Sequence, residues 1–220
     1  TTTINQLKLG NINQKNYFSY INYDMELGNF TINPAVRFDY FQFSYLDKLA
    51  PTFKIDNEEE VKISPKLNFL FAPNNKVQYF LKSGLGFHSN DTRVVVSPTD
   101  KKTVPTSAGA DLGTIFKPMN NLIINSALWF LQLEQEFVYV GDAGIVEPSG
   151  KTRRMGIDFG FRYQLSKFIN LNSDINYTYA RSTEEPEGQN YIPLAPDLTS
   201  TGGISITNYK GFSSNLNYRY

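Results

Sequence analysis

Ten segments in which apolar and polar residues alternate, arranged as five pairs, constrain the fold of this chain more than any other feature. Between Ile169 and Arg181, one parity is apolar and the other carries amide, carboxylate and hydroxyl groups. The apolar residues are Ile169, Leu171, Ile175, Tyr177 and Tyr179, and the polar ones are Asn170, Asn172, Asp174, Asn176 and Thr178. Side chains of a β-strand point alternately to its two faces, so each segment predicts a strand with one apolar and one polar face.

The segment 152–165 alternates most strictly. Its apolar residues Met155, Ile157, Phe159, Phe161, Tyr163 and Leu165 alternate with Arg154, Gly156, Asp158, Gly160, Arg162 and Gln164. A soluble sandwich would bury its apolar faces, but here Tyr and Phe recur on those faces from strand to strand. The pattern favours a wall that faces lipid and surrounds a polar interior.

Short and long connections alternate along the chain. Short turns are expected at Gly28-Asn29, 73–75, 118–120, 166–168 and 208–211. They join paired strands expected at 15–27 and 30–46, 61–72 and 76–88, 106–117 and 121–140, 152–165 and 169–181, and 197–207 and 212–220. Long polar loops are expected at 47–60, 89–105, 141–151 and 182–195. This alternation is typical of an all-β, antiparallel up-and-down transmembrane β-barrel whose short turns share one rim.

Parity also assigns single residues to faces. Between 121 and 140, it predicts Ala127, Trp129 and Leu131 on the lipid-facing side and Ser126, Gln132 and Glu134 on the inside. Phe87 is expected to face lipid as well. The inward glycines Gly84, Gly86, Gly156 and Gly160 either leave room inside the barrel or ease strand curvature.

Composition excludes several classes of protein. Mean hydropathy is −0.36, and no run of 18 apolar residues exists, so no transmembrane helix is expected. The net charge of zero gives no reason to expect a nucleic-acid partner. The lack of cysteine excludes disulfides and thiolate metal sites. A soluble meander or sandwich is less favoured, because such folds seldom combine strands this long with such regular loops.

No group of residues indicates an enzyme, and no cofactor is expected. His88 lies beside Ser89 and Asp91, but a catalytic triad needs a base oriented by a third group, so hydrogen bonding at the rim is favoured. Glu134 and Glu136 share a parity, where solvation or pairing with arginine is favoured over catalysis or metal binding.

Lys151, Arg153 and Arg154 form a basic cluster in sequence near a strand start. Salt links within the loop are the simplest role. Attraction of an anionic ligand, or of lipopolysaccharide phosphate, is the alternative.

Three motifs carry a resemblance to a known family. Residues 83–91 read SGLGFHSND, residues 137–144 read FVYVGDAG and lead into EPSGKTRRMG at 147–156, and residues 192–196 read IPLAP. Together they resemble strand ends and loop-to-strand passages of TonB-dependent outer-membrane receptors. The resemblance covers essentially the whole chain.

The resemblance implies a larger protein than these 220 residues. Such receptors have a barrel of about 22 strands, an N-terminal plug domain inside it, and a segment that contacts TonB. Residues 1–220 then correspond to a later portion of the barrel, about ten strands, with the plug, the earliest strands and the last strands missing. Both ends of the chain look cut.

The resemblance also implies a function: active uptake of a scarce, bulky nutrient such as a siderophore–metal chelate across the outer membrane of a Gram-negative bacterium. Expected partners are the TonB complex (through the missing N-terminal region), the protein's own plug domain, lipid and lipopolysaccharide; the sequence leaves the transported ligand unidentified. Ligand contacts are expected at the rim and loops, from His88, Asp91, Arg93, Asp142, Lys151, Arg153 and Arg154. A passive porin and an outer-membrane barrel enzyme are the alternatives.

Overall fold

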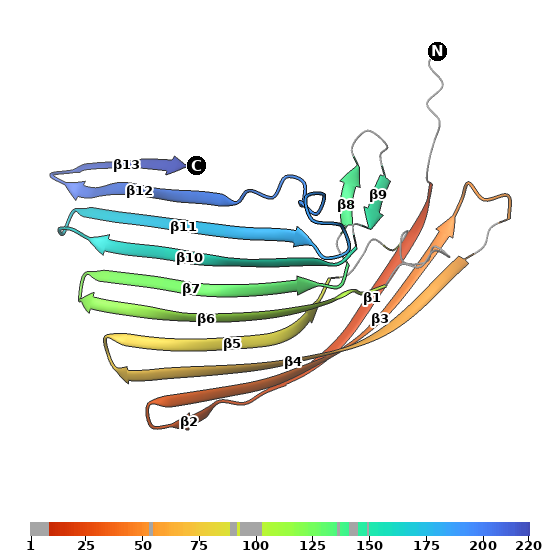
Figure 1. Ribbon diagram of the computed structural model, residues 1–220, viewed down its shortest axis with the longest axis horizontal. Helices are drawn as coiled ribbons and strands as arrows, with labels where there is room; N and C mark the ends of the chain where they lie inside the picture. Colours follow the sequence, from red (N-terminus) through yellow and green to blue (C-terminus); the bar gives the residue numbers. More distant parts are fainter. Residues whose placement is uncertain are drawn as a thin grey trace, which may run out of the picture.

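A single curved antiparallel sheet makes up most of the structure (Figure 1). The computed structural model describes residues 9–52, 55–88, 92, 103–135, 137–140, 145–148 and 150–220, with 137–140 and 145–148 described by backbone alone. The strands of the sheet are β1 (Gly10–Asn22), β2 (Met25–Leu27), β3 (Phe30–Asp47), β4 (Ile55–Asn74), β5 (Val77–Phe87), β6 (Thr106–Met119), β7 (Leu122–Leu133), β10 (Thr152–Gln164), β11 (Ile169–Ser182), β12 (Leu198–Tyr209) and β13 (Phe212–Arg219). The order of strands in the sheet follows the chain, as expected for an up-and-down meander, except that β1 and β2 both pair with β3.

The predicted alternation of short and long connections is confirmed. Figure 1 shows the turns after β2, β4, β6, β10 and β12 at one end of the sheet and the longer connections at the other end. Gly28 and Gly211 lie in two of the short turns with φ of 62° and 84°, a conformation that glycine adopts without steric cost. The turn between β4 and β5 lies at residues 75–76, one to two residues later than predicted.

The first predicted strand is split at residues 23–24 because of Pro34 on the adjacent β3. Proline has no N–H to donate into the ladder, and Tyr23 N–H donates to Pro34 O at 3.1 Å. The Asn33 amide bridges the gap, since its Nδ2 donates to Asn22 Oδ1 at 2.6 Å and to Tyr23 O at 3.2 Å.

The prediction of a loop at 47–60 was wrong for its second half. β4 begins at Ile55, and its acidic residues pair with β3: Phe43 lies opposite Glu58 and Phe41 opposite Glu60. Asp and Glu are disfavoured in strands, which is why the run looked like a loop. Strand preference, however, depends on context, and β3 provides a cross-strand partner for every residue of β4 from 55 to 71.

The prediction of one strand over 121–140 was also wrong. β7 ends at Leu133, and a separate two-stranded sheet follows, in which β8 (Phe137–Val140) pairs with β9 (Ile145–Pro148). This hairpin occupies part of the predicted loop 141–151 and lies at the long-loop end (Figure 1).

Register shows which side chains share a face of the sheet. One row across five strands is apolar: Leu81, Leu112, Leu128, Ile157 and Tyr177 are successive cross-strand partners. The next row is Lys82, Asp111, Trp129, Gly156 and Thr178. The apolar row is open to the surroundings, with Leu112 at 57% and Leu128 at 55% exposure, which would be costly in water. This face therefore suits a lipid environment.

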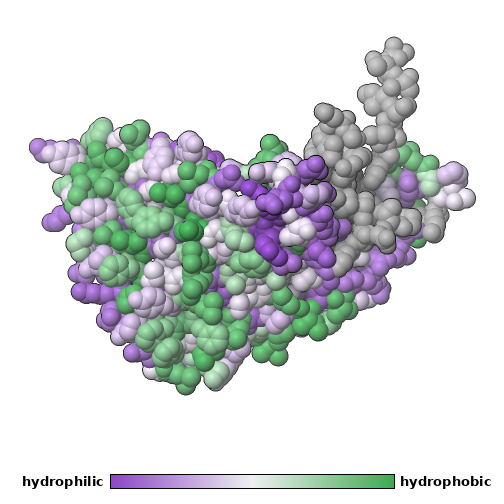
Figure 2. Space-filling view, in the orientation of Figure 1, coloured by the Kyte–Doolittle hydropathy of each residue, from purple (hydrophilic) through white to green (hydrophobic). Residues whose placement is uncertain are grey.

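Figure 2 shows apolar residues gathered over the strands and hydrophilic residues at the short-turn end and over the loop region. An apolar band between two polar rims is the pattern of a barrel wall in a bilayer. None of the described residues form a helix long and apolar enough to cross a membrane.

The face assignment of β7 was wrong, whereas that of β10 and β11 is confirmed. Ala127 and Trp129 are cross-strand partners of Asp158 and Gly156, so they lie on the polar face, and Ser126 and Gln132 lie on the other. Both parities of β7 are largely apolar, so its own alternation does not determine its face. Pairing with β6 and β10 determines it.

Candidate functional site on the concave face

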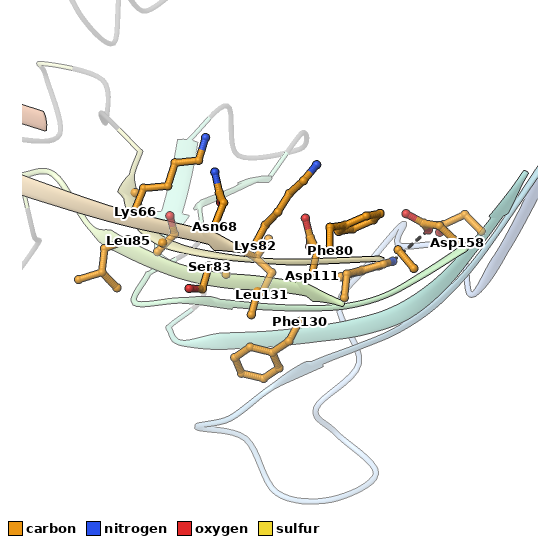
Figure 3. Close-up of a pocket in the computed structure, with 18 residues that line it drawn as sticks. Lys66, Asn68, Phe80, Lys82, Ser83, Leu85, Asp111, Phe130, Leu131 and Asp158 are labelled. Atoms are coloured by element: carbon orange, nitrogen blue, oxygen red, sulfur yellow. Dashed lines mark hydrogen bonds between the residues drawn. The ribbon is translucent and has the colours of Figure 1, made fainter. Parts of the chain in front are cut away.

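The polar, concave face of the sheet holds a cavity of about 660 Å³ over β4 to β11. Lys66, Asn68, Lys82, Asp111 and Asp158 rise from this side of the strands, whereas Phe130 points away on the other side (Figure 3). The alternation of each strand puts these polar groups on one face, and the sheet curvature turns them toward one another. A concavity of this size, lined by apolar as well as charged side chains, is suited to hold another part of the protein or a ligand with polar groups.

Trp129 and Asp158 form the centre of a hydrogen-bond network on this face. Trp129 Nε1 donates to Asp158 Oδ1 at 3.0 Å (Figure 3). Asn176 Nδ2 also donates to Asp158 Oδ1, and Thr178 Oγ1 donates to Asn176 Oδ1 at 2.7 Å. The network joins β7, β10 and β11 and holds the indole against the wall.

Gly156 makes room for this tryptophan. A Cβ at Gly156 would come within 2.5 Å of the Trp129 ring and 2.2 Å of the Tyr177 carbonyl oxygen. The inward glycine therefore provides space for a side chain of the barrel wall itself, in addition to the two roles considered from sequence.

Lys66 and Lys82 are the exposed cations of the cavity. Their strands β4 and β5 pair so that Lys66 lies opposite Gly84 and Lys82 opposite Asn68. The Lys82 ammonium lies 4.6 Å from the centre of the Phe80 ring. Among the described residues, neither lysine forms a salt bridge. Asp111, the cross-strand partner of Lys82, lines the same cavity together with Asp158.

A second polar network lies on the same face of β1 and β3. Asp39, whose side chain is fully buried, accepts two hydrogen bonds at 2.8 Å from the Arg37 guanidinium and one at 3.1 Å from Asn16 Nδ2. The guanidinium also lies 4.1 Å from the centre of the Phe18 ring. These contacts satisfy the buried carboxylate, as burial of a charge requires.

An apolar cluster covers this wall near the long-loop end. Phe41 and Phe43 are 2% and 1% exposed and pack with Val104, and the Phe87 ring meets Phe41 edge-on at 5.3 Å. The prediction that Phe87 faces lipid was therefore wrong, because the last residue of β5 packs against the Phe41 side of the sheet. Thr92, from the connection between β5 and β6, donates to Gln14 Oε1 at 3.4 Å, so this connection reaches across to β1.

The predicted site residues do not form one group. His88 follows β5 directly, is exposed, and donates its backbone N–H to Pro105 O at 3.0 Å. Lys151 lies 4.0 Å from Glu184. Asp91, Arg93 and Asp142 lie outside the described residues.

The basic cluster predicted at the rim is divided between two faces. Arg154 pairs with Leu131 and has the parity of Asp158, so it lies on the concave face. Arg153 pairs with Gln132 and Arg181 and has the parity of Ile157, so it lies on the apolar face. Adjacent strand residues cannot act on the same side of a sheet.

The residues considered as catalytic candidates from sequence either have other contacts or lie outside the described residues. Glu134 Oε2 accepts a hydrogen bond at 3.0 Å from the backbone N–H of Thr106, while Ser89, Asp91 and Glu136 lie outside the described residues. Within the described part of the chain, no three His, Asp or Glu side chains are grouped to hold a metal ion. Sequence reasoning missed Trp129 as an interior residue. Its pairing with the strictly alternating segment 152–165 could have revealed it.

A meander of long strands with one apolar and one polar face defines the class of outer-membrane β-barrels. The chain belongs to the TonB-dependent receptor family: residues 2–220 match the family model described as "TonB dependent receptor-like, beta-barrel". The barrels of this family are outer-membrane proteins.

Solved structures with the same fold include three transport proteins. The ferric-catecholate import receptor Fiu from K12 E. coli has a TM-score of 0.73 at 12% identity, with 96% of this chain and 34% of Fiu covered. The ferric citrate transporter FecA has a TM-score of 0.78 at 17% identity, with 94% of this chain and 32% of FecA covered. The copper transporter OprC has a TM-score of 0.72 at 13% identity, with 96% of this chain and 35% of OprC covered. The chain thus spans about a third of the length of these structures. The search of curated proteins gives no match.

Proposed function

We propose that this chain is part of the wall of an outer-membrane active transporter that imports a scarce, bulky nutrient with energy supplied through TonB. The observation that carries the proposal is the family match over residues 2–220. Consistent with it, the sheet has one apolar and one polar face. Residues 1–220 would form a partial barrel domain. A plug domain from another part of the protein would fill the concave face, and the TonB complex would contact the region before the plug.

The proposed substrate class is an anionic metal chelate. The similar structures include a ferric-catecholate import receptor, a ferric citrate transporter and a copper transporter. Lys66 and Lys82 face the cavity without a salt bridge among the described residues and would contact an anionic substrate there, beside Asp111 and Asp158 of the same lining. His88 and Arg154, with Asp91, Arg93, Asp142 and Lys151, remain proposed contacts at the rim.

Uptake by cells that carry the full-length receptor tests the proposal. Deletion of the gene should reduce accumulation of one chelate from a panel of ferric siderophores, ferric citrate and copper complexes, and the restored gene should recover it only with active TonB. Recovery without TonB would favour a passive porin. Accumulation that deletion leaves unchanged for every member of the panel would reject transport of a metal chelate.

A further inference from the structure

Two arginines face each other across strands on the apolar face, near the long-loop end. Arg153 of β10 and Arg181 of β11 are direct cross-strand partners. Their parities are those of Ile157 and Tyr177, so both side chains lie on the face assigned to lipid. Like charges directly opposite in a sheet destabilise the pairing. An anion bound between the two guanidinium groups would remove this repulsion.

The side chain of Arg181 is held in place by two tyrosines. The centres of the Tyr179 and Tyr191 rings lie 4.1 Å and 4.2 Å from its guanidinium carbon. One N–H group donates to Ala180 O at 2.7 Å, out of five donors on a guanidinium. Arg153 is exposed, and neither arginine forms a salt bridge among the described residues.

The position along the strand places this pair at the edge of the apolar band. On β10, the residues of this parity from Tyr163 to Met155 are all apolar or aromatic, and Arg153 comes next. Ten residues at about 3.3 Å each, on a strand tilted by about 40°, rise about 25 Å, which is the height of the apolar band of such barrels. Arg153 and Arg181 therefore lie where lipid headgroups meet hydrocarbon.

We propose that Arg153 and Arg181 bind the phosphate of a lipid headgroup in the leaflet at the long-loop rim. Arginine binds phosphate through paired hydrogen bonds, and tyrosines are favoured at this depth because their rings are amphipathic. The inference rests on the proposed role as a wall of an outer-membrane barrel, with the apolar face toward lipid, and is independent of transport and TonB.

Native mass spectrometry of the full-length receptor in detergent tests the proposal, with dioleoyl phosphatidate as the probe and dioleoylglycerol as its counterpart without phosphate. The receptor should bind phosphatidate and not dioleoylglycerol. Arg153→Gln with Arg181→Gln should weaken phosphatidate binding at least about tenfold, the effect of one charge-assisted hydrogen bond. The matched control Lys167→Gln with Lys210→Gln, at the short-turn rim, should bind as the unaltered receptor does.

Arg153→Gln alone is a second variant for the case in which loss of the Arg181 ring contacts impairs folding. Arg153 has no ring contact among those described. This single variant should weaken phosphatidate binding severalfold. Equal binding of dioleoylglycerol, or unchanged phosphatidate binding by the arginine variants, would overturn the proposal. Displacement of phosphatidate by millimolar inorganic phosphate would also overturn it, since the site would then take a free anion.

Discussion

Asp39, Asp158 and Asp174 on the concave face each accept hydrogen bonds from an adjacent strand. Asp39 accepts from Asn16, Asp158 from Trp129 and Asn176, and Asp174 from Arg162 at 2.7 Å. The contribution of each carboxylate to stability depends on how exposed its side chain is. The Arg162–Asp174 side chains are about half exposed, at 51% and 48%, and such pairs contribute about 0–1 kcal/mol. The Asp39 side chain is fully buried and cannot lose its partners without a penalty.

Replacement of Asp158 by alanine should destabilise the full-length barrel by about 1–3 kcal/mol, because Trp129 Nε1 and Asn176 Nδ2 lose their acceptor. Equilibrium urea unfolding of the refolded protein in detergent measures this. Asp111→Ala is the matched control on the same face, since Asp111 has no hydrogen-bond or salt-bridge partner among the described residues. Equal losses of unfolding free energy in the two variants would show that the hydrogen bonds to Asp158 add no measurable stability.

Lysine in place of Phe159 should cost about 2–4 kcal/mol if this face meets lipid at mid-depth. Phe159 is 41% exposed, on the apolar face. Thr201→Lys is the control at similar depth, because Thr201 pairs with Asp174 on the polar face, where a cation meets a carboxylate. Urea unfolding in detergent compares the two. A soluble protein with this sheet would show similar effects at both positions.

Single residues were predictable where one parity was clearly polar. Between 152 and 181 every assigned face agrees with the observed register. Trp129 was misassigned because both parities of β7 are mostly apolar and its polar partner, Asp158, lies on another strand. The division of Arg153 from Arg154 follows from alternation itself. It was missed because the cluster was defined by closeness in the sequence, without assigning each side chain to a face.

At the level of elements, β3 and β4 are the longest strands, at 18 and 20 residues. About 9–11 residues suffice to cross a bilayer, so this hairpin extends beyond the apolar band at the loop end. The acidic residues of β4 lie in that extension, where water solvates them. Gln42 Nε2 donates to Glu59 Oε1 at 3.2 Å across the two strands.

Hydrogen exchange of the full-length receptor should distinguish a strand from a loop at 55–60. Backbone amides paired in a sheet exchange slowly because exchange requires opening. We expect amides 55–60 to be protected nearly as well as 61–70 and far better than 48–52, which lie outside any strand. Uniformly fast exchange over 48–60 would restore the loop interpretation.

The misread elements share a physical cause. The strand at 55–60 has a composition that disfavours strands and forms because β3 provides a partner, and the β8–β9 hairpin forms from two four-residue segments too short to give a periodic signal. The turns and the long alternating strands were predictable, since glycine geometry and period-two alternation are local properties. Contacts such as Thr92 with Gln14 join residues 78 positions apart and have no local signature.

At the scale of the whole molecule, the sheet is open as far as the structure describes the chain: β1 pairs only with β3 there, and β13 only with β12. All short turns share one rim (Figure 1). In barrels of this class, short turns face the periplasm and long loops face outside. Labelling of introduced cysteines can test this orientation, and the chain has no cysteine of its own that would react.

Single cysteines in the intact receptor should report this orientation. A membrane-impermeant thiol reagent applied to whole cells should label cysteine at Glu187 or Leu49, in long connections, and should not label it at Asn29 or Lys167, in short turns. The unaltered receptor serves as the control for background labelling. Labelling of the short-turn positions alone would reverse the proposed topology.

The isolated 220 residues should not form a functional barrel. In hydrocarbon, each unpaired backbone donor or acceptor costs several kcal/mol, and the outer edges of β1 and β13, which span 13 and 8 residues, have no partner within the described sheet. Closure of the sheet into a smaller cylinder would increase its curvature and crowd the concave face, where Trp129 already fills the space at Gly156. We therefore expect the isolated chain to aggregate or remain unfolded in detergent, whereas the full-length receptor migrates on gels in a heat-modifiable form. Heat-modifiable migration of the isolated chain, together with ligand uptake by cells that express it alone, would show that it closes into a complete small barrel.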